Sequence, residues 1–120
     1  MLKISNINWL SKSAKEAVVT ISDYKYTFFT FCQPCDYRIE QLIDEPIHAF
    51  ITENLCKSDT NAYDIRETGD LSYKCIAKVV VQLDNLVKIG DVWIKLDIDI
   101  PSWAEEGSFI EFECARLDLW

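Results

Sequence analysis

The chain has 120 residues, of which 49% are apolar, and it carries a formal net charge of −8 at pH 7. This length predicts a single domain over residues 1–120 with a core of its own, and the apolar fraction excludes a disordered chain. No apolar run is long enough to cross a bilayer, and the amino-terminal residues show no secretory pattern, so we expect a cytoplasmic protein. The acidic side chains are spread along the chain. They repel phosphate backbones, which favours a cationic protein partner over nucleic acid.

Alternating apolar and polar residues predict strands through most of the amino-terminal half, because successive side chains of a strand point to opposite faces. The expected strands cover residues 2–9, 17–21, 24–33 and 46–54. Before the last of these, the spacing of Ile39, Leu42 and Ile43 is helical instead. With Asp36 as its N-cap and Pro46 as its stop, this segment predicts a short helix.

The carboxyl-terminal half contains the strongest strand signals of the chain. We expect strands over residues 73–83, 92–100 and 110–115, a polar loop over 57–70 with a helical turn near 62–66, and a second helical turn over 102–107. About six short strands separated by turn residues are typical of a small all-β fold. The sequence therefore predicts a mainly antiparallel, OB-like barrel or a sandwich with one or two short helices.

Cys32 and Cys35 form a C-x-x-C motif, which occurs both in redox pairs and in zinc sites. No strand–helix–strand unit surrounds the pair, and no second C-x-x-C or H-x-x-H spacing supplies further zinc ligands. We therefore interpret the pair as structural thiols and predict no metal and no cofactor. A zinc site and a redox pair remain alternatives.

His48 is the only histidine and lies in a predicted strand. General acid–base chemistry usually recruits a histidine or paired carboxylates, and a nucleophile needs such a base beside it. The sequence contains no glycine-rich phosphate loop, nucleophile elbow or zincin helix. We therefore predict a protein that is not an enzyme.

Paired carboxylates and one tryptophan mark the last third of the chain as a candidate binding surface. Asp97 and Asp99, like Glu111 and Glu113, are two residues apart and share a face of their strand. If the two strands pair, these acidic rows are adjacent and offer a docking surface for a cationic partner. Trp93 lies on the polar face of its strand and is the candidate apolar anchor. The alternatives are a solvated outer face, a metal site for the carboxylates, and a second layer covering Trp93.

Four lysines on neighbouring predicted strands give a second, weaker candidate surface. They are Lys74, Lys78, Lys88 and Lys95, which would form a basic stripe beside Trp93. An OB-like barrel that binds single-stranded nucleic acid, or another small ligand, uses such a combination of cations and exposed rings. The net charge of the chain opposes this interpretation, which we keep as the alternative function.

The segments LVKIGDVWIKLD and EEGSFIEFECARLDLW resemble the carboxyl-terminal third of small uncharacterised bacterial β-barrel proteins. In size, acidity and lack of catalytic motifs, the chain is also similar to immunity proteins, which neutralise bacterial toxins by capping them. This resemblance implies a non-enzymatic inhibitor that covers a basic toxin domain. Trp93, Asp97, Asp99, Glu111 and Glu113 are then the expected contact residues.

Overall fold

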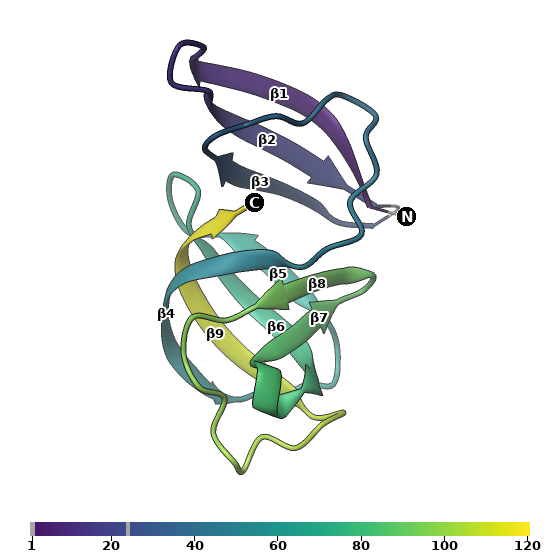
Figure 1. Ribbon diagram of the computed structural model, residues 1–120. Coiled ribbons are helices and arrows are strands. Elements are labelled where there is room, and N and C mark those ends of the chain that lie inside the picture. The colour runs from purple at the N-terminus through teal and green to yellow at the C-terminus, as the bar shows by residue number, and fades with distance from the viewer. Residues whose placement is uncertain (1, 24) are drawn as a thin grey trace.

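The computed structural model describes residues 2–23 and 25–120, which form nine strands and one 3₁₀ helix (Figure 1). The elements are β1 (Lys3–Ser11), β2 (Glu16–Ser22), β3 (Thr27–Cys32), β4 (Ile47–Lys57), β5 (Asp64–Glu67), β6 (Tyr73–Val81), η1 (Gln82–Asp84), β7 (Leu86–Ile89), β8 (Val92–Lys95) and β9 (Phe109–Asp118). Tyr24, with which one predicted strand begins, lies outside the described residues. The prediction of an all-β fold is confirmed.

Five strands close into a small barrel, which forms the lower part of the molecule in Figure 1. They follow the order β9-β4-β8-β7-β6, and β6 pairs back onto β9. The β4–β8 pair is parallel, whereas the other pairs within the barrel are antiparallel. Closure removes free sheet edges from these strands. The short strand β5 adds to β6 on the outside of the closed ring.

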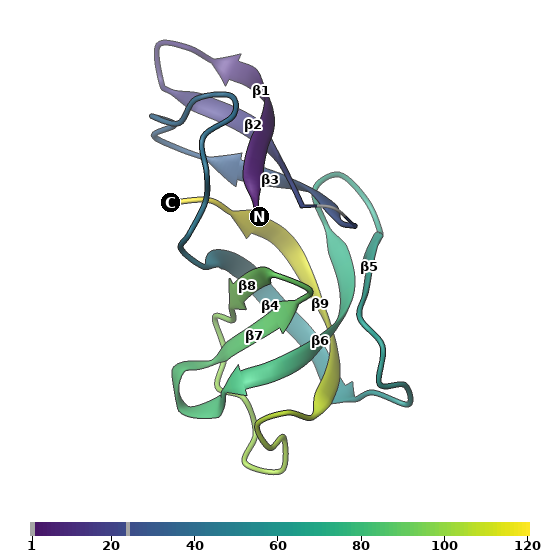
Figure 2. The same ribbon diagram turned by 90° about the vertical axis from the view of Figure 1, so that its right-hand side faces the viewer.

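The first three strands are the antiparallel end of the same nine-stranded sheet; this part, the amino-terminal sheet, extends away from the barrel (Figure 2). One parallel pairing, between Phe31 on β3 and Asp118 on β9, joins this sheet to the barrel. Beside it, the N–H of Leu119 donates a hydrogen bond of 2.9 Å to the carbonyl of Phe31. The molecule is accordingly elongated, with extents of 44 × 26 × 25 Å.

Alternating side chains fill one continuous hydrophobic core that runs through both parts. The bulkiest fully buried members are Tyr73, Phe28, Phe112, Ile4, Ile21, Ile47, Ile89, Ile94, Ile110 and Leu117. Phe28 from β3 meets Tyr73 from β6 edge to face, with ring centroids 6.4 Å apart. The amino-terminal sheet and the barrel therefore share this core.

The helix predicted between Asp36 and Pro46 is absent, and this prediction is wrong. The segment is irregular and bonds to β1 and the residue before it instead: the N–H of Glu40 donates to the carbonyl of Ile4, at 2.8 Å, and further bonds join residue 41 to Ile4 and residue 43 to Leu2. Ile39 and Leu42 remain 54% and 52% exposed. Pairing with β1 therefore outcompetes the weak helical spacing of these residues.

The predicted helical turns are also wrong. Residues 102–107 form two successive turns, in which Ala104 donates to the carbonyl of Pro101 and Ser108 to that of Glu105. Residues 64–67 form β5 rather than a helical turn, because they pair with β6. Among the described residues the only helix is η1, at the end of the strand predicted over 73–83.

The strand predicted over residues 92–100 ends early, at Lys95. Asn85, at the end of η1, binds the residues that follow Lys95. Its backbone carbonyl accepts the N–H of Leu96 at 2.9 Å, and its side-chain oxygen accepts the N–H of Ile100 at 2.9 Å. Asn85 has a left-handed backbone with φ of 55°, a conformation that asparagine tolerates well. Residues 96–100 therefore form a loop, although apolar and polar residues alternate there.

Candidate functional site

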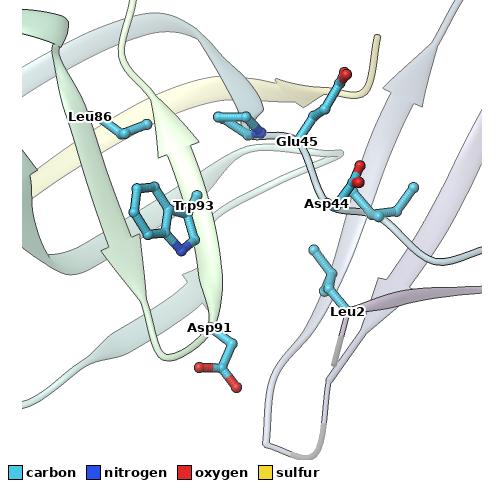
Figure 3. A pocket seen from close by; sticks show the side chains of 8 residues that line it. Leu2, Asp44, Glu45, Leu86, Asp91 and Trp93 are labelled. Atoms are coloured by element: carbon cyan, nitrogen blue, oxygen red, sulfur yellow. The ribbon is translucent and has the colours of Figure 1, made fainter.

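A groove with a volume of about 680 Å³ lies between the amino-terminal sheet and the barrel (Figure 3). Trp93 on β8 and Leu86 on β7 form its barrel side, and Leu2 faces them from the start of β1. Residues 43–46, at the end of the connection from β3 to β4, form the remaining wall. Its apolar residues include Ile43 and Pro46. Four separate segments of the chain therefore meet at this groove.

The β7–β8 hairpin presents Trp93 to the groove. Its neighbours Val92 and Ile94 point into the barrel and are completely buried, whereas Trp93 points outward and is 41% exposed. The hairpin turns at Gly90, which has φ of +59°. A side chain at Gly90 would lie only 2.9 Å from the ring of Tyr26, so the turn packs directly on the loop between β2 and β3. The hairpin is thus held against the amino-terminal sheet.

Among the described residues, the three charged side chains that line the groove are acidic: Asp44, Glu45 and Asp91. Their side chains are exposed, and none forms an ion pair with another described residue. In the register of the hairpin Lys88 lies opposite Trp93, so a cation borders the groove on that side. The site combines an apolar floor with a rim that is mainly negative.

Asp97, a predicted contact residue, holds the backbone of β4. Its two carboxylate oxygens accept the N–H groups of Ile51, at 2.7 Å, and of Thr52, at 3.0 Å. Partial burial would raise the pKa of Asp97, but the hydrogen bonds from Thr52 and Ile51 outweigh it, so the pKa lies below its ordinary value. Ile51 has φ of +56°, an uncommon value for a β-branched residue. Asp97 therefore stabilises a distorted point of the strand.

The other three predicted carboxylates also have neighbours within the fold. Asp99 accepts a hydrogen bond of 3.4 Å from the side chain of Asn85, Glu111 forms an ion pair of 2.9 Å with Lys74, and Glu113 accepts a hydrogen bond from the side chain of Asn54. Strand β9 pairs with β3, β4 and β6 but not with β8, so the two acidic rows are not adjacent. None of these carboxylates lines the groove, and of the five predicted contact residues only Trp93 does.

The predicted basic stripe forms in part. Across β6, β7 and β8 the register places Lys78 opposite Lys88, and Lys88 opposite Trp93. The ammonium of Lys78 lies 5.4 Å from the ring centroid of Phe109 and 5.8 Å from that of Tyr63. Two other lysines lie outside this row: Lys74 is paired with Glu111, and Lys95 pairs in register with Leu86.

Cys32 and Cys35 are both buried, at 1% and 3% exposure. Burial raises the pKa of the Cys32 thiol to about 12, so this thiol carries almost no reactive thiolate near neutral pH. In residues 2–23 and 25–120, no three or more His, Cys, Asp and Glu side chains gather as a metal site would require. Both thiols belong to the hydrophobic core.

His48 lies on the outer face of β4, where its ring is stacked on that of Trp120 with centroids 3.7 Å apart and an interplanar angle of 10°. Burial lowers the pKa of His48, and the nearby charge of Lys95 lowers it further. The imidazole is therefore mainly neutral at pH 7 and packs as an aromatic ring.

Sequence reasoning identified Trp93 but missed the acidic residues beside it. Asp44 and Glu45 lie at the end of the segment predicted to be a helix, and Asp91 immediately precedes the strand predicted over residues 92–100. The pattern around each residue is local, whereas the groove depends on how the hairpin packs on the amino-terminal sheet. No signal in the sequence connects the two.

Comparisons of the chain with family models, with curated proteins and with solved structures give no match. Over the residues that the structure describes, no helix has the length and apolar character needed to span a membrane.

Proposed function

We propose that this protein is a non-enzymatic binding protein of the immunity type, which caps a basic protein partner such as a toxin domain. The groove beside Trp93 carries this proposal, because it joins an exposed indole and an apolar floor to three acidic residues without an ion pair to another described residue. Arginine and lysine side chains combine an apolar stem with a cationic head, which fits this arrangement. Of the contact residues predicted from the sequence, this proposal keeps Trp93 and replaces the four carboxylates of residues 97–113 with the acidic residues of the groove.

The two components of the groove have different roles in association. The carboxylates of Asp44, Glu45 and Asp91 would attract a basic partner and make the association rate fall with salt. Trp93 would be covered on binding, and a buried indole mainly slows dissociation. Binding of this chain over the partner's active site would be enough to block it, so the proposed inhibition requires no catalytic residue in this chain.

Affinity capture from the native host at low salt tests the proposal. The tagged wild-type chain is expected to retain one basic protein at unit stoichiometry and to release it as the salt concentration rises. Trp93→Ala should lose the partner, whereas Trp103→Ala, which removes an exposed tryptophan from the loop before β9, should keep it. Equal retention by both variants would place the contact elsewhere.

One observation favours a second function, the binding of single-stranded nucleic acid. The row of Lys78, Lys88 and Trp93, with Tyr63 and Phe109 beside Lys78, joins two cations to exposed or half-buried rings. Fluorescence anisotropy with a labelled oligonucleotide tests this alternative. Binding that is lost in Lys78→Glu and kept in Lys74→Glu would support it, because the ammonium of Lys74 is already paired with Glu111.

A further inference from the structure

A second surface, distinct from the groove, lies on the outside of β3, β9 and β4, where the amino-terminal sheet joins the barrel. We call it the aromatic face, and it consists of Phe29, Phe31, Phe50, Arg116, Asp118 and Trp120. Strand pairing places four of them side by side, because Phe31 pairs with Asp118, and Arg116 with Phe50. Phe29 lies two residues before Phe31 on the same side of β3, and Trp120 stacks on His48, which pairs with Asp118.

Three rings of the aromatic face are strongly exposed. Trp120 is 65% exposed, Phe50 45% and Phe29 37%. Because an aromatic side chain has roughly 200 Å² of surface, these rings together leave roughly 300 Å² in contact with water. This area is comparable with the largest exposed apolar patch of a typical monomer, which is often a functional surface.

The charges within the aromatic face balance each other. The Arg116 guanidinium lies 4.2 Å from the ring centroid of Phe31 and 4.9 Å from that of Phe50. Asp118 accepts two hydrogen bonds from it, at 2.6 and 3.1 Å. Arg116 and Asp118 therefore contribute one charge of each sign, and the pocket beside Phe50 and Trp120 adds Lys95 and Asp97, again one of each sign, so this surface is neutral. The whole chain, in contrast, carries a net charge of −8.

We propose that the aromatic face is the contact between two copies of this chain, related by a two-fold axis. Two chains of net charge −8 repel each other, so a contact between them is favoured where the surface is neutral. Arg116 and Asp118 lie two residues apart on the same side of β9. A two-fold axis between them brings each Arg116 opposite Asp118 of the second copy, and it stacks ring against ring around this centre.

The area of the aromatic face sets the strength of this contact. Two faces with roughly 300 Å² of exposed ring each bury well under the ~1,200 Å² of a stable interface. The dimer is therefore weak and forms in a concentration-dependent manner. The inference does not rest on the proposed function, since the aromatic face and the groove share no residue.

Sedimentation velocity of the full chain, from about 10 µM to about 1 mM, tests this inference in the range where contacts of this size form. The average mass is expected to rise toward that of a dimer. Trp120→Glu should keep the chain monomeric, whereas Trp103→Glu should dimerise as the wild type does. The two variants are matched, because each replaces an exposed tryptophan, at 65% and 52%, and adds one negative charge.

A second variant separates the contact from the stack of Trp120 on His48. Phe29→Glu changes the aromatic face on β3 and leaves that stack intact, and it is also expected to prevent dimerisation. A wild-type chain that stays monomeric up to about 1 mM would overturn the proposal, since even weak contacts are populated there. Dimerisation that persists in both Trp120→Glu and Phe29→Glu would also overturn the proposal.

Discussion

The backbone N–H of Phe29 on β3 donates a hydrogen bond of 2.8 Å to the hydroxyl of Tyr73 on β6. Strand β3 pairs with β9 only at Phe31, so at Phe29 the two parts of the molecule have already diverged. The tyrosine hydroxyl therefore replaces a missing strand partner. Tyr73 is 2% exposed, and burial raises its pKa to about 12, which keeps the phenol neutral.

Tyr73→Phe removes this acceptor and leaves a partly buried N–H without a partner. We expect the free energy of unfolding to fall by about 1–2 kcal/mol, the usual cost of such a loss. Denaturant unfolding measures this change, and hydrogen exchange should become faster at the Phe29 amide. Tyr63→Phe is the control, because its hydroxyl makes no hydrogen bond to another described residue. Equal losses in the two variants would contradict a joining role for Tyr73.

Asp97 and Asp99 are expected to differ in their effect on stability. Asp97→Ala leaves two backbone N–H groups of β4 without their acceptor and should cost about 1–3 kcal/mol. Asp99→Ala removes one long side-chain contact of 3.4 Å and should change the stability by less than about 0.5 kcal/mol, as exposed substitutions usually do. Urea denaturation of both variants decides the matter, and a reversed order would refute the structural role of Asp97.

Gly90 is expected to be sensitive to substitution for two reasons. Gly90→Ala places a Cβ 2.9 Å from the ring of Tyr26 and also strains a backbone with φ of +59°. Gly107→Ala is the matched control, because it has φ of +90° and open space around the new Cβ. Thermal unfolding should therefore show a larger loss for Gly90→Ala, about 1–3 kcal/mol, the range that overpacking usually costs. If the losses are equal, the contact between the hairpin and Tyr26 contributes little.

The single histidine predicts a pH dependence of stability. Burial lowers the pKa of His48 in the folded chain, so the unfolded chain binds the proton more readily. The free energy of unfolding should therefore fall as the pH drops below about 6.5, the ordinary histidine pKa, and level off below the lowered value. Unfolding at a series of pH values, compared with His48→Gln, isolates this contribution. A variant with the same pH dependence would show that other groups cause it.

Strand alternation is a local property, and this explains what could be predicted. Residues 17–21, for example, alternate because β2 has one buried and one outward face, so its sequence reports its structure directly. Residues 96–100 continue the same alternation, yet Asn85 holds them in a loop. The segment 36–46 has helical spacing but bonds to β1. Both outcomes depend on partners distant in the sequence, which periodicity does not report.

The residues of the candidate site were harder to predict from the sequence than the strands, because most of them meet only through long-range packing. Trp93 was predicted to be outward because its strand neighbours are apolar, and that inference needs only the residues beside it. Asp44 and Glu45 join it through the packing of the β7–β8 hairpin on the amino-terminal sheet. The adjacency expected for the acidic rows required pairing of β8 with β9, which the barrel does not form.

The most direct test of the proposed function is an NMR titration of the isotopically labelled chain with a short amphipathic peptide of lysine and leucine. We expect saturable shifts at Leu2, residues 43–46, Leu86, Asp91 and the Trp93 indole, and we expect them to weaken with salt. A matched peptide of glutamate and leucine should cause none. Shifts centred on β9, or a response that survives in Trp93→Ala, would contradict the assignment of the groove as the binding site.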